Sequence, residues 1–224
     1  LNNKKLVTTL SIQSLAASLY TVPNTITRLC KKLGYDGYSQ LKNSLKEELH
    51  TELKEHDIVE NSLHTTIQKT FDLIDVDKIQ IVTKILREAK KILFFGVGDS
   101  VLFCEMMVKN LRVAGKQTEF SIHPHEIRHG INQLKKGDVL FLISLSGETP
   151  QVLEMAELGK RKSIHIISLT HFYRNSLQKL ADTNLYCYAP KKHLNGHNVT
   201  DQTSPIIVLR TLSEYFWKET CGCV

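Results

Sequence analysis

The chain has 224 residues, of which 42% are hydrophobic and 23% are charged. The length allows one ordinary domain, or a small module attached to a mid-sized one, and the composition is typical of a soluble globular protein. No apolar run is long enough to span a membrane and no signal-peptide pattern opens the chain, so a cytoplasmic protein is expected.

The five cysteines have irregular spacing and form no Cys-x-x-Cys pair. This pattern argues against a disulfide framework, and we expect reduced, mostly structural thiols. Cys221 and Cys223 lie in a terminal Cys-Gly-Cys segment, for which a frayed tail is expected and a metal or redox role stays open.

The net charge of +6 comes from the first part of the chain. Residues 1–46 contain seven basic side chains and one acidic side chain, whereas the other 178 residues are balanced with 22 of each sign. A basic segment of this kind predicts a polyanionic partner.

Two short helices are predicted within this basic segment. Ser11 can cap the first, over residues 11–19, and Ile12, Leu15, Ala16 and Leu19 form its apolar face. The second opens at Pro23 and ends before Gly34, with an inner face of Ile26, Leu29, Cys30 and Leu33. Such a pair predicts either a helix-turn-helix or a plain helical hairpin with a solvated basic face.

The outer face of the second helix favours DNA binding. It carries Asn24, Thr25, Thr27, Arg28, Lys31 and Lys32. Asn24, Thr25 and Arg28 are of the types that read base edges, and the two lysines suit backbone phosphates.

The segments Ser11 to Ala16, Pro23 to Arg28 and Cys30 to Tyr35 resemble the amino-terminal pattern of RpiR-type bacterial transcriptional regulators. Family members commonly carry glycine in the inter-helix turn and serine as the second N-cap, where this chain has Tyr20 and Val22. Because valine caps poorly, we expect a less stable turn. Since only ten residues precede Ser11 and the first is not methionine, we expect either a trimmed amino terminus or a short first helix.

A connecting helix is predicted over residues 39–55, with a stripe of Leu41, Leu45, Leu49 and Leu53 that is part solvated and part available to a partner subunit. The polar residues 56–62 mark the boundary between a domain at 1–56 and another at 57–224. Helices and strands then alternate, which predicts an α/β domain with a doubly wound parallel sheet. Helices are expected at 65–73, 76–89, 101–114, 126–134, 150–162, 176–180 and 204–218, and strands at 91–97, 117–122, 139–143, 164–169 and 185–189.

The loop after the strand at 139–143 is the first candidate binding site. Ser144, Ser146, Gly147 and Thr149 lie between a strand's carboxyl end and a helix amino terminus, where open α/β sheets bind ligands. Free N–H groups, the helix dipole and small hydroxyls there favour a phosphate monoester. The alternative is an ordinary helix cap.

A second loop, Gly96-Val97-Gly98-Asp99-Ser100, follows another buried strand. The two loops together resemble those of the sugar isomerase (SIS) domain, whose Ser-x-Ser-Gly-Glu-Thr motif is matched at Ser144–Thr149 and whose Gly-x-Gly-x-Ser motif is matched at Gly96–Ser100. The resemblance implies that Ser144, Ser146 and Thr149 hold phosphate, with Gly98, Ser100, Gly147 and Glu148 lining the site. RpiR-type regulators join a helix-turn-helix to such a domain in this order.

The resemblance leaves two functions open. The first hypothesis is a regulator, not an enzyme, in which a sugar phosphate alters the binding of an operator in double-stranded DNA. The second is an aldose–ketose isomerase, for which Glu148 and five histidines are candidates without a clear constellation: His123, His125, His129, His193 and His197. We expect no metal, no cofactor, and a homodimer or higher homo-oligomer.

Overall fold

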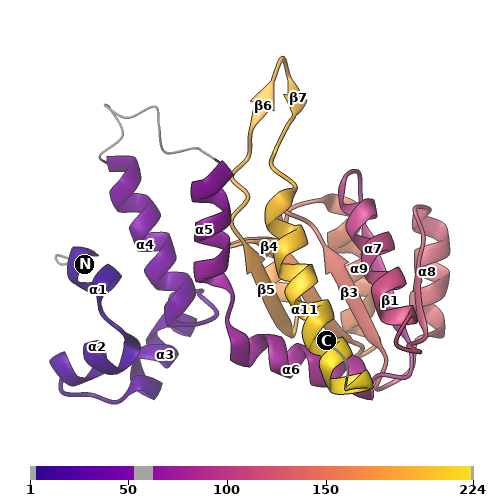
Figure 1. Cartoon of the computed structure of the whole chain (residues 1–224), viewed down its shortest axis with the longest axis horizontal. Helices are drawn as coiled ribbons and strands as arrows, with labels where there is room; N and C mark the ends of the chain where they lie inside the picture. Colours follow the sequence, from indigo (N-terminus) through magenta and orange to yellow (C-terminus); the bar gives the residue numbers. More distant parts are fainter. Residues whose placement is uncertain (1–3, 53–62, 223–224) are drawn as a thin grey trace. The chain divides into compact units, whose positions relative to one another are not determined.

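The computed structural model describes residues 4–52 and 63–222. Contacts divide the chain into two units, the first comprising residues up to Thr65 with Phe172–Arg174, and the second comprising Thr66–His171 with the chain from Asn175 onward (Figure 1). The predicted domain boundary at residues 56 and 57 lies outside the described residues.

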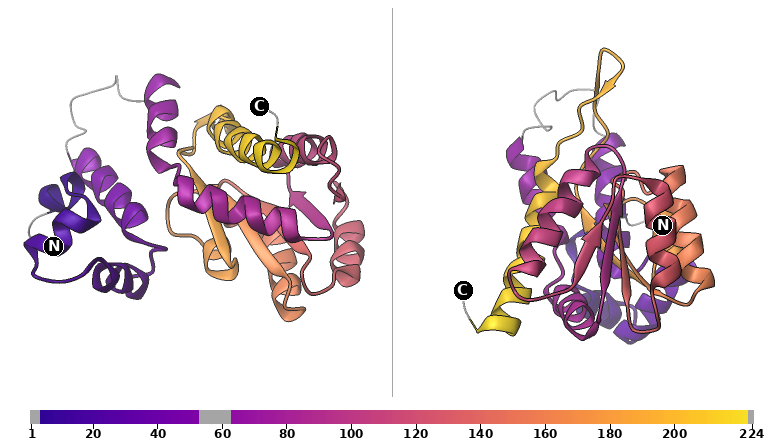
Figure 2. Two further views of the ribbon diagram at one scale, coloured as in Figure 1. Left: turned by 60° about the horizontal axis from the view of Figure 1, so that its bottom comes forward. Right: turned by 90° about the vertical axis from the view of Figure 1, so that its right-hand side faces the viewer.

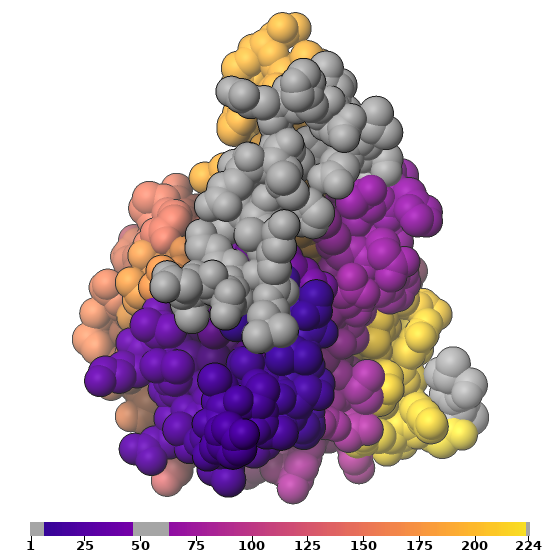
Figure 3. Space-filling model, turned by 90° about the vertical axis from the view of Figure 1, so that its left-hand side faces the viewer, coloured from indigo at the N-terminus to yellow at the C-terminus, as the bar shows by residue number. Residues whose placement is uncertain are grey.

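The first unit is all-helical, as predicted. It contains α1 (Lys4–Thr9), α2 (Ile12–Ser18), α3 (Pro23–Lys32) and α4 (Tyr38–Glu52), coloured indigo to violet in Figures 1 and 3. Ser11 caps α2, since its hydroxyl accepts from the Ser14 N–H at 3.0 Å. A small core joins the helices: Leu15, Ala16, Ile26, Cys30, Tyr35, Tyr38, Leu41 and Leu45.

Three predicted core leucines of this unit are exposed. Leu19, Leu29 and Leu33 were assigned to the inner faces of α2 and α3, and each lies on the surface. The reason is that α3 reaches the core only through Ile26 and Cys30, one turn apart, so the stripe that it buries is narrower than the apolar pattern. The side chains of Leu49 and Leu53 lie outside the described part of the chain.

The second unit contains a five-stranded parallel sheet, which confirms the predicted fold class. Its strands are β1 (Ile92–Gly96), β2 (Thr118–Phe120), β3 (Val139–Ile143), β4 (His165–His171) and β5 (Thr183–Cys187). Their order is β2-β1-β3-β4-β5, with every neighbouring pair parallel.

Helices cover both faces of this sheet (Figure 2). One core cluster joins the sheet to α6 (Val76–Glu88), α7 (Ser100–Arg112) and α11 (Thr203–Cys221). The other joins it to α8 (Pro124–Gln133), α9 (Pro150–Arg161) and α10 (Ser176–Leu180). Phe94 and Phe141 stack on the first face at 5.0 Å between ring centroids. The unbroken apolar sequence of β3 follows from burial on both faces.

Several element bounds and one hairpin of the second unit differ from the prediction. The last strand of the sheet begins two residues earlier than expected, at Thr183, because Asn184 is buried and hydrogen-bonded to Ser168. A hairpin of β6 (His193–Leu194) and β7 (His197–Asn198) was not predicted. Helix α5 (Leu63–Leu73), whose residues from Thr66 onward belong to this unit, has bounds close to those of the predicted helix. No helix in the described ranges is long and apolar enough to cross a membrane.

Candidate functional site

Three hydroxyl groups converge in the loop between β3 and α9. Ser144 Oγ lies 2.9 Å from Thr149 Oγ1 and 3.4 Å from Ser146 Oγ, and the Ser146 and Thr149 hydroxyls are 3.5 Å apart. Ser144 is buried at the end of the strand, whereas Ser146 and Thr149 are half-buried. The structure therefore brings the three predicted phosphate-binding side chains together.

The backbone of the same loop offers N–H donors. Gly147 adopts a φ of 64°, a left-handed conformation that glycine takes without strain. Its N–H donates to the Ser144 carbonyl at 2.9 Å, while within the described part of the chain the N–H groups of Ser146 and Thr149 have no acceptor. Thr149 is the N-cap of α9, and its side chain does not cap the helix. The positive end of the α9 dipole thus faces a cluster of hydroxyls and unpaired donors, which suits an anion.

The loop between β1 and α7 lies at the same edge of the sheet. Gly96 pairs with Ile143, so the two loops leave neighbouring strands at the point where the strand order reverses. A Cβ on Gly96 would lie 2.7 Å from Ser100 Cβ and 3.1 Å from the Ile143 carbonyl oxygen. Only glycine therefore lets Ser100 approach the end of β3. Gly98 in this loop has a φ of 62° and open space around it.

Glu148 binds a neighbouring helix rather than the hydroxyl cluster. Its Oε1 accepts from the N–H of Ser176, which is the first residue of α10, at 2.7 Å. Asn175 caps the same helix by accepting from the Gln178 N–H at 2.8 Å, and its amide donates to Thr170 Oγ1 at 3.1 Å. The sequence analysis did not single out Asn175, although asparagine before a short helix is an N-cap signal.

The five histidines do not form a common site. His123 and His125 are exposed and stack at 5.5 Å, next to Glu126. A hydrogen bond from Ser121 and the charges of these two histidines lower the pKa of the Glu126 carboxyl. His129 is bonded to Gln133 on α8, and the other two histidines lie in the β6–β7 hairpin. Among residues 4–52 and 63–222, no three His, Cys, Asp or Glu side chains are grouped to hold a metal ion.

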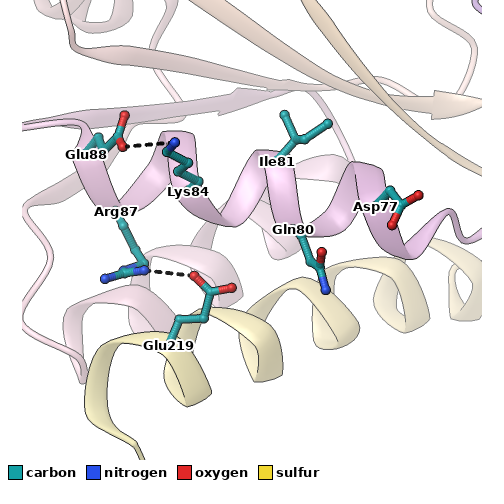
Figure 4. A pocket seen from close by; sticks show the side chains of 7 residues that line it. All are labelled: Asp77, Gln80, Ile81, Lys84, Arg87, Glu88 and Glu219. Carbon is teal, nitrogen blue, oxygen red and sulfur yellow. Dashed lines mark hydrogen bonds and ion pairs between the residues drawn. The ribbon is translucent and has the colours of Figure 1, made fainter.

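A surface pocket between α6 and α11 is separate from both loops (Figure 4). Four of its charged side chains pair with one another, Arg87 with Glu219 at 2.8 Å and Lys84 with Glu88 at 3.9 Å. Arg87 and Glu88 precede β1, at the amino edge of the sheet, whereas the hydroxyl cluster lies at the carboxyl edge. This pocket therefore does not include any predicted site residue.

In the first unit, α3 presents most of the predicted DNA-binding side chains to solvent. Asn24, Thr25, Arg28, Lys31 and Lys32 are all exposed. Thr27 is half-buried, and its hydroxyl donates to the Pro23 carbonyl at 3.2 Å. Neither α2 nor α3 contains an acidic residue, so every charged side chain on the exposed face of α3 is basic.

The parallel sheet and its two glycine- and serine-bearing loops define an SIS domain. Residues 85–212 match the SIS domain family, and residues 1–52 match the helix-turn-helix domain of the rpiR family. The chain belongs to the RpiR family of helix-turn-helix transcriptional regulators, and is a DNA-binding regulator that carries an SIS domain.

Individual relatives are similar in sequence or structure along most of the chain. An HTH-type transcriptional regulator of Caldanaerobacter subterraneus is 30% identical over 227 residues, which covers 95% of this chain and 80% of the relative. RpiR of Escherichia coli K12 is 26% identical over 221 residues, which covers 92% of this chain and 73% of RpiR. The structure of Vibrio vulnificus NanR complexed with ManNAc-6P superposes with a TM-score of 0.66 at 25% identity, covering 99% of this chain and 84% of NanR.

Proposed function

We propose that the SIS domain binds a phosphorylated sugar and that this binding changes the affinity of the regulator for its operator. The observation that carries the proposal is the convergence of the Ser144, Ser146 and Thr149 hydroxyls at the amino terminus of α9. A phosphate dianion placed there would accept from three hydroxyls and from loop N–H groups, with the helix dipole favouring its charge. The related NanR, which was solved with a sugar phosphate, supports this ligand class.

The remaining site residues have roles that follow from their positions. Ser100 and the Gly98 backbone, on the neighbouring β1–α7 loop, face the sugar side of the bound phosphate. Gly147 keeps the loop backbone close to the phosphate, and Glu148 holds the loop against α10.

DNA is bound by the exposed face of α3. Asn24, Thr25 and Arg28 contact base edges, whereas Lys31 and Lys32 contact phosphates, with Thr27 at the margin of this surface. A homodimer is the proposed working unit, because two recognition helices are needed to read two half-sites.

The SIS domain is proposed to bind its sugar phosphate without converting it. Isomerisation needs a general base beside C1 and C2 of the sugar, and the Glu148 carboxylate already accepts from the α10 backbone. Isomerases share this fold, as shown by phosphoheptose isomerase GmhA of Neisseria gonorrhoeae, with a TM-score of 0.54 at 17% identity. Isomerase activity is therefore the second candidate, and turnover of a hexose or pentose phosphate by the full chain would favour it.

The test uses fluorescence anisotropy of the full chain on DNA from upstream of its own and neighbouring genes. We expect salt-dependent binding that one sugar phosphate shifts and its unphosphorylated parent does not. Ser144→Ala combined with Ser146→Ala should abolish the shift and leave DNA affinity in the absence of sugar unchanged. An unchanged response of this double variant would contradict the loop assignment.

A matched pair of variants tests the DNA surface. Lys31→Ala should weaken all DNA alike and reduce the salt dependence, whereas Arg28→Ala should relax sequence preference. Lys136→Ala, an exposed lysine of the second unit, serves as the charge control and should change neither property.

A further inference from the structure

An apolar surface adjoins the basic face of α3. Leu29 on α3 is 52% exposed. Three further large apolar side chains nearby in the sequence are exposed as well: Leu19 at the end of α2, and Val22 and Leu33 at the two ends of α3. Single exposed leucines are common on proteins, but several large apolar side chains within two short helices and their turn are a concentration that a binding partner would explain.

The helical positions place Leu29 next to the base-reading residues. Ile26 and Cys30 point into the core, so with 3.6 residues per turn Arg28 lies opposite the core. Thr25 and Leu29 are one turn apart and form one side of the same outward face. A groove that receives Arg28 would therefore also contact the Thr25 methyl and the Leu29 side chain.

The chemistry of DNA limits what these apolar groups can meet. In the major groove the edges of the bases present hydrogen-bond donors and acceptors, and the thymine C5-methyl is the apolar group among them. Four residues of helix rise by about 6 Å, close to two base steps of about 3.4 Å each. Thr25 and Leu29 are thus spaced to reach methyl groups about two steps apart.

We infer that Leu29, together with the methyl group of Thr25, reads thymine methyl groups in the operator. This inference rests on the proposed binding of DNA by α3 and adds a specificity element to it. Leu29 would distinguish thymine from cytosine, which lacks the methyl group, beside a base read by Arg28.

A second copy of the unit is a weaker candidate for covering Leu29. The neighbouring Arg28, Lys31 and Lys32 are exposed, and α2 and α3 carry no acidic residue that could pair with them. Two such faces brought together would repel each other, whereas DNA neutralises the same charges. Charge complementarity therefore favours DNA as the occupant.

The experiment begins with selection of bound duplexes from a random library by the full chain. Each thymine of the selected half-site is then replaced by deoxyuridine, which removes only the C5-methyl, and the Kd is measured by anisotropy. For wild type, we expect about a fourfold loss of affinity at each contacted thymine, the equivalent of about 0.8 kcal/mol for one buried methyl group.

Variants assign the methyl contacts to residues. Leu29→Ala should bind the thymine and deoxyuridine duplexes equally at one position, and Thr25→Ser, which keeps the hydroxyl, should do so at the other. Leu33→Ala, a leucine of similar exposure beyond the last turn of α3, should retain both sensitivities.

The outcomes separate this inference from the proposed function. If wild type binds selected DNA but ignores deoxyuridine, or if Leu29→Ala stays as sensitive as wild type, the inference is wrong while DNA binding by α3 stands. If Leu29→Ala instead lowers the mass of the assembly in ultracentrifugation, Leu29 is a protein contact and the inference is also overturned. If no duplex is selected and binding shows no salt dependence, the proposed DNA binding itself fails.

Discussion

Gly147 lies against Asn175 so closely that a Cβ atom on Gly147 would stand 2.2 Å from the Asn175 side-chain amide. Asn175 in turn caps α10 and bonds Thr170 at the end of β4. The conformation of the loop between β3 and α9 is therefore coupled to the neighbouring strand and helix through a contact that only glycine permits.

Gly147→Ala should destabilise the second unit and disorder the hydroxyl cluster. The left-handed φ of 64° costs an alanine about 1–2 kcal/mol, and the clash with Asn175 adds about 1–3 kcal/mol more. Urea unfolding followed by circular dichroism measures the loss, and sugar-phosphate titration measures the effect on the site.

Gly137→Ala is the matched control for this prediction. Gly137 also has a positive φ, of 94°, but nothing lies within 4 Å of its ideal Cβ. It should therefore show the backbone cost alone and keep ligand affinity. Equal losses of stability in the two variants would mean that the Asn175 contact has no energetic weight.

Glu148 should act through hydrogen bonding and not through proton transfer. Its Oε1 accepts from the Ser176 N–H at 2.7 Å, and a glutamine oxygen can accept the same bond. Glu148→Gln should hence keep most of the sugar-phosphate affinity, whereas Glu148→Ala should lose about 1 kcal/mol of stability around α10. Calorimetric titration of both variants checks this, and equal loss of binding in both would show that the carboxylate charge itself is required.

Tyr20 occupies a position that a glycine would fill with less strain. It is 99% exposed and has a φ of 50° in the turn between α2 and α3. Tyr20→Gly should relieve about 1 kcal/mol of backbone strain and slow amide exchange in α3 about fivefold. Tyr20→Ala, which loses the ring but keeps the strain, should show no such gain. Faster exchange in the glycine variant would indicate that the exposed ring stabilises the turn.

Much of the fold was predictable because continuous apolar runs in the sequence correspond to buried strands. The β3 run is buried on both faces, and the strand that it predicted has the observed bounds Val139–Ile143. The three hydroxyls of the following loop could be located in sequence for the same reason, since a strand with known ends fixes where its loop begins.

Other features were not predicted, some of them because tertiary contacts bury residues that are polar in the sequence. Thr183 and Asn184 are polar and were therefore predicted to lie in a loop, but both belong to β5. The buried side-chain amide of Asn184 donates to the Gln178 carbonyl at 3.1 Å. The β6–β7 hairpin did carry a local signal, the Asn195-Gly196 pair, whose φ values of 50° and 79° are those of a tight hairpin turn. Leu29 was wrongly predicted to be buried, because the periodicity of apolar residues does not show how much of the helix surface its neighbours cover.

The cysteines offer a test of the packing in the second unit. Cys30, Cys104 and Cys187 are buried, whereas Cys221 is exposed. Burial raises the pKa of the Cys104 thiol to about 12, so almost no thiolate forms near neutral pH. Iodoacetamide under native conditions should modify Cys221 quickly and Cys104 only on unfolding, as read by site-resolved mass spectrometry. Equal rates would mean that the face of the sheet covered by α7 is open.

Cys104 should also make the second unit less stable at alkaline pH. Its folded pKa of about 12 lies above the ordinary value of 9.0, so the folded state keeps a proton that the unfolded chain releases. The contribution is therefore complete below pH 9.0 and is lost as the pH rises toward 12. Between about pH 9.5 and 10.5 the free energy of unfolding of wild type should fall by roughly 1 kcal/mol more than that of Cys104→Ala, which lacks the titrating thiol. Parallel pH dependence of the two proteins in urea unfolding would show that the thiol titrates normally in the fold.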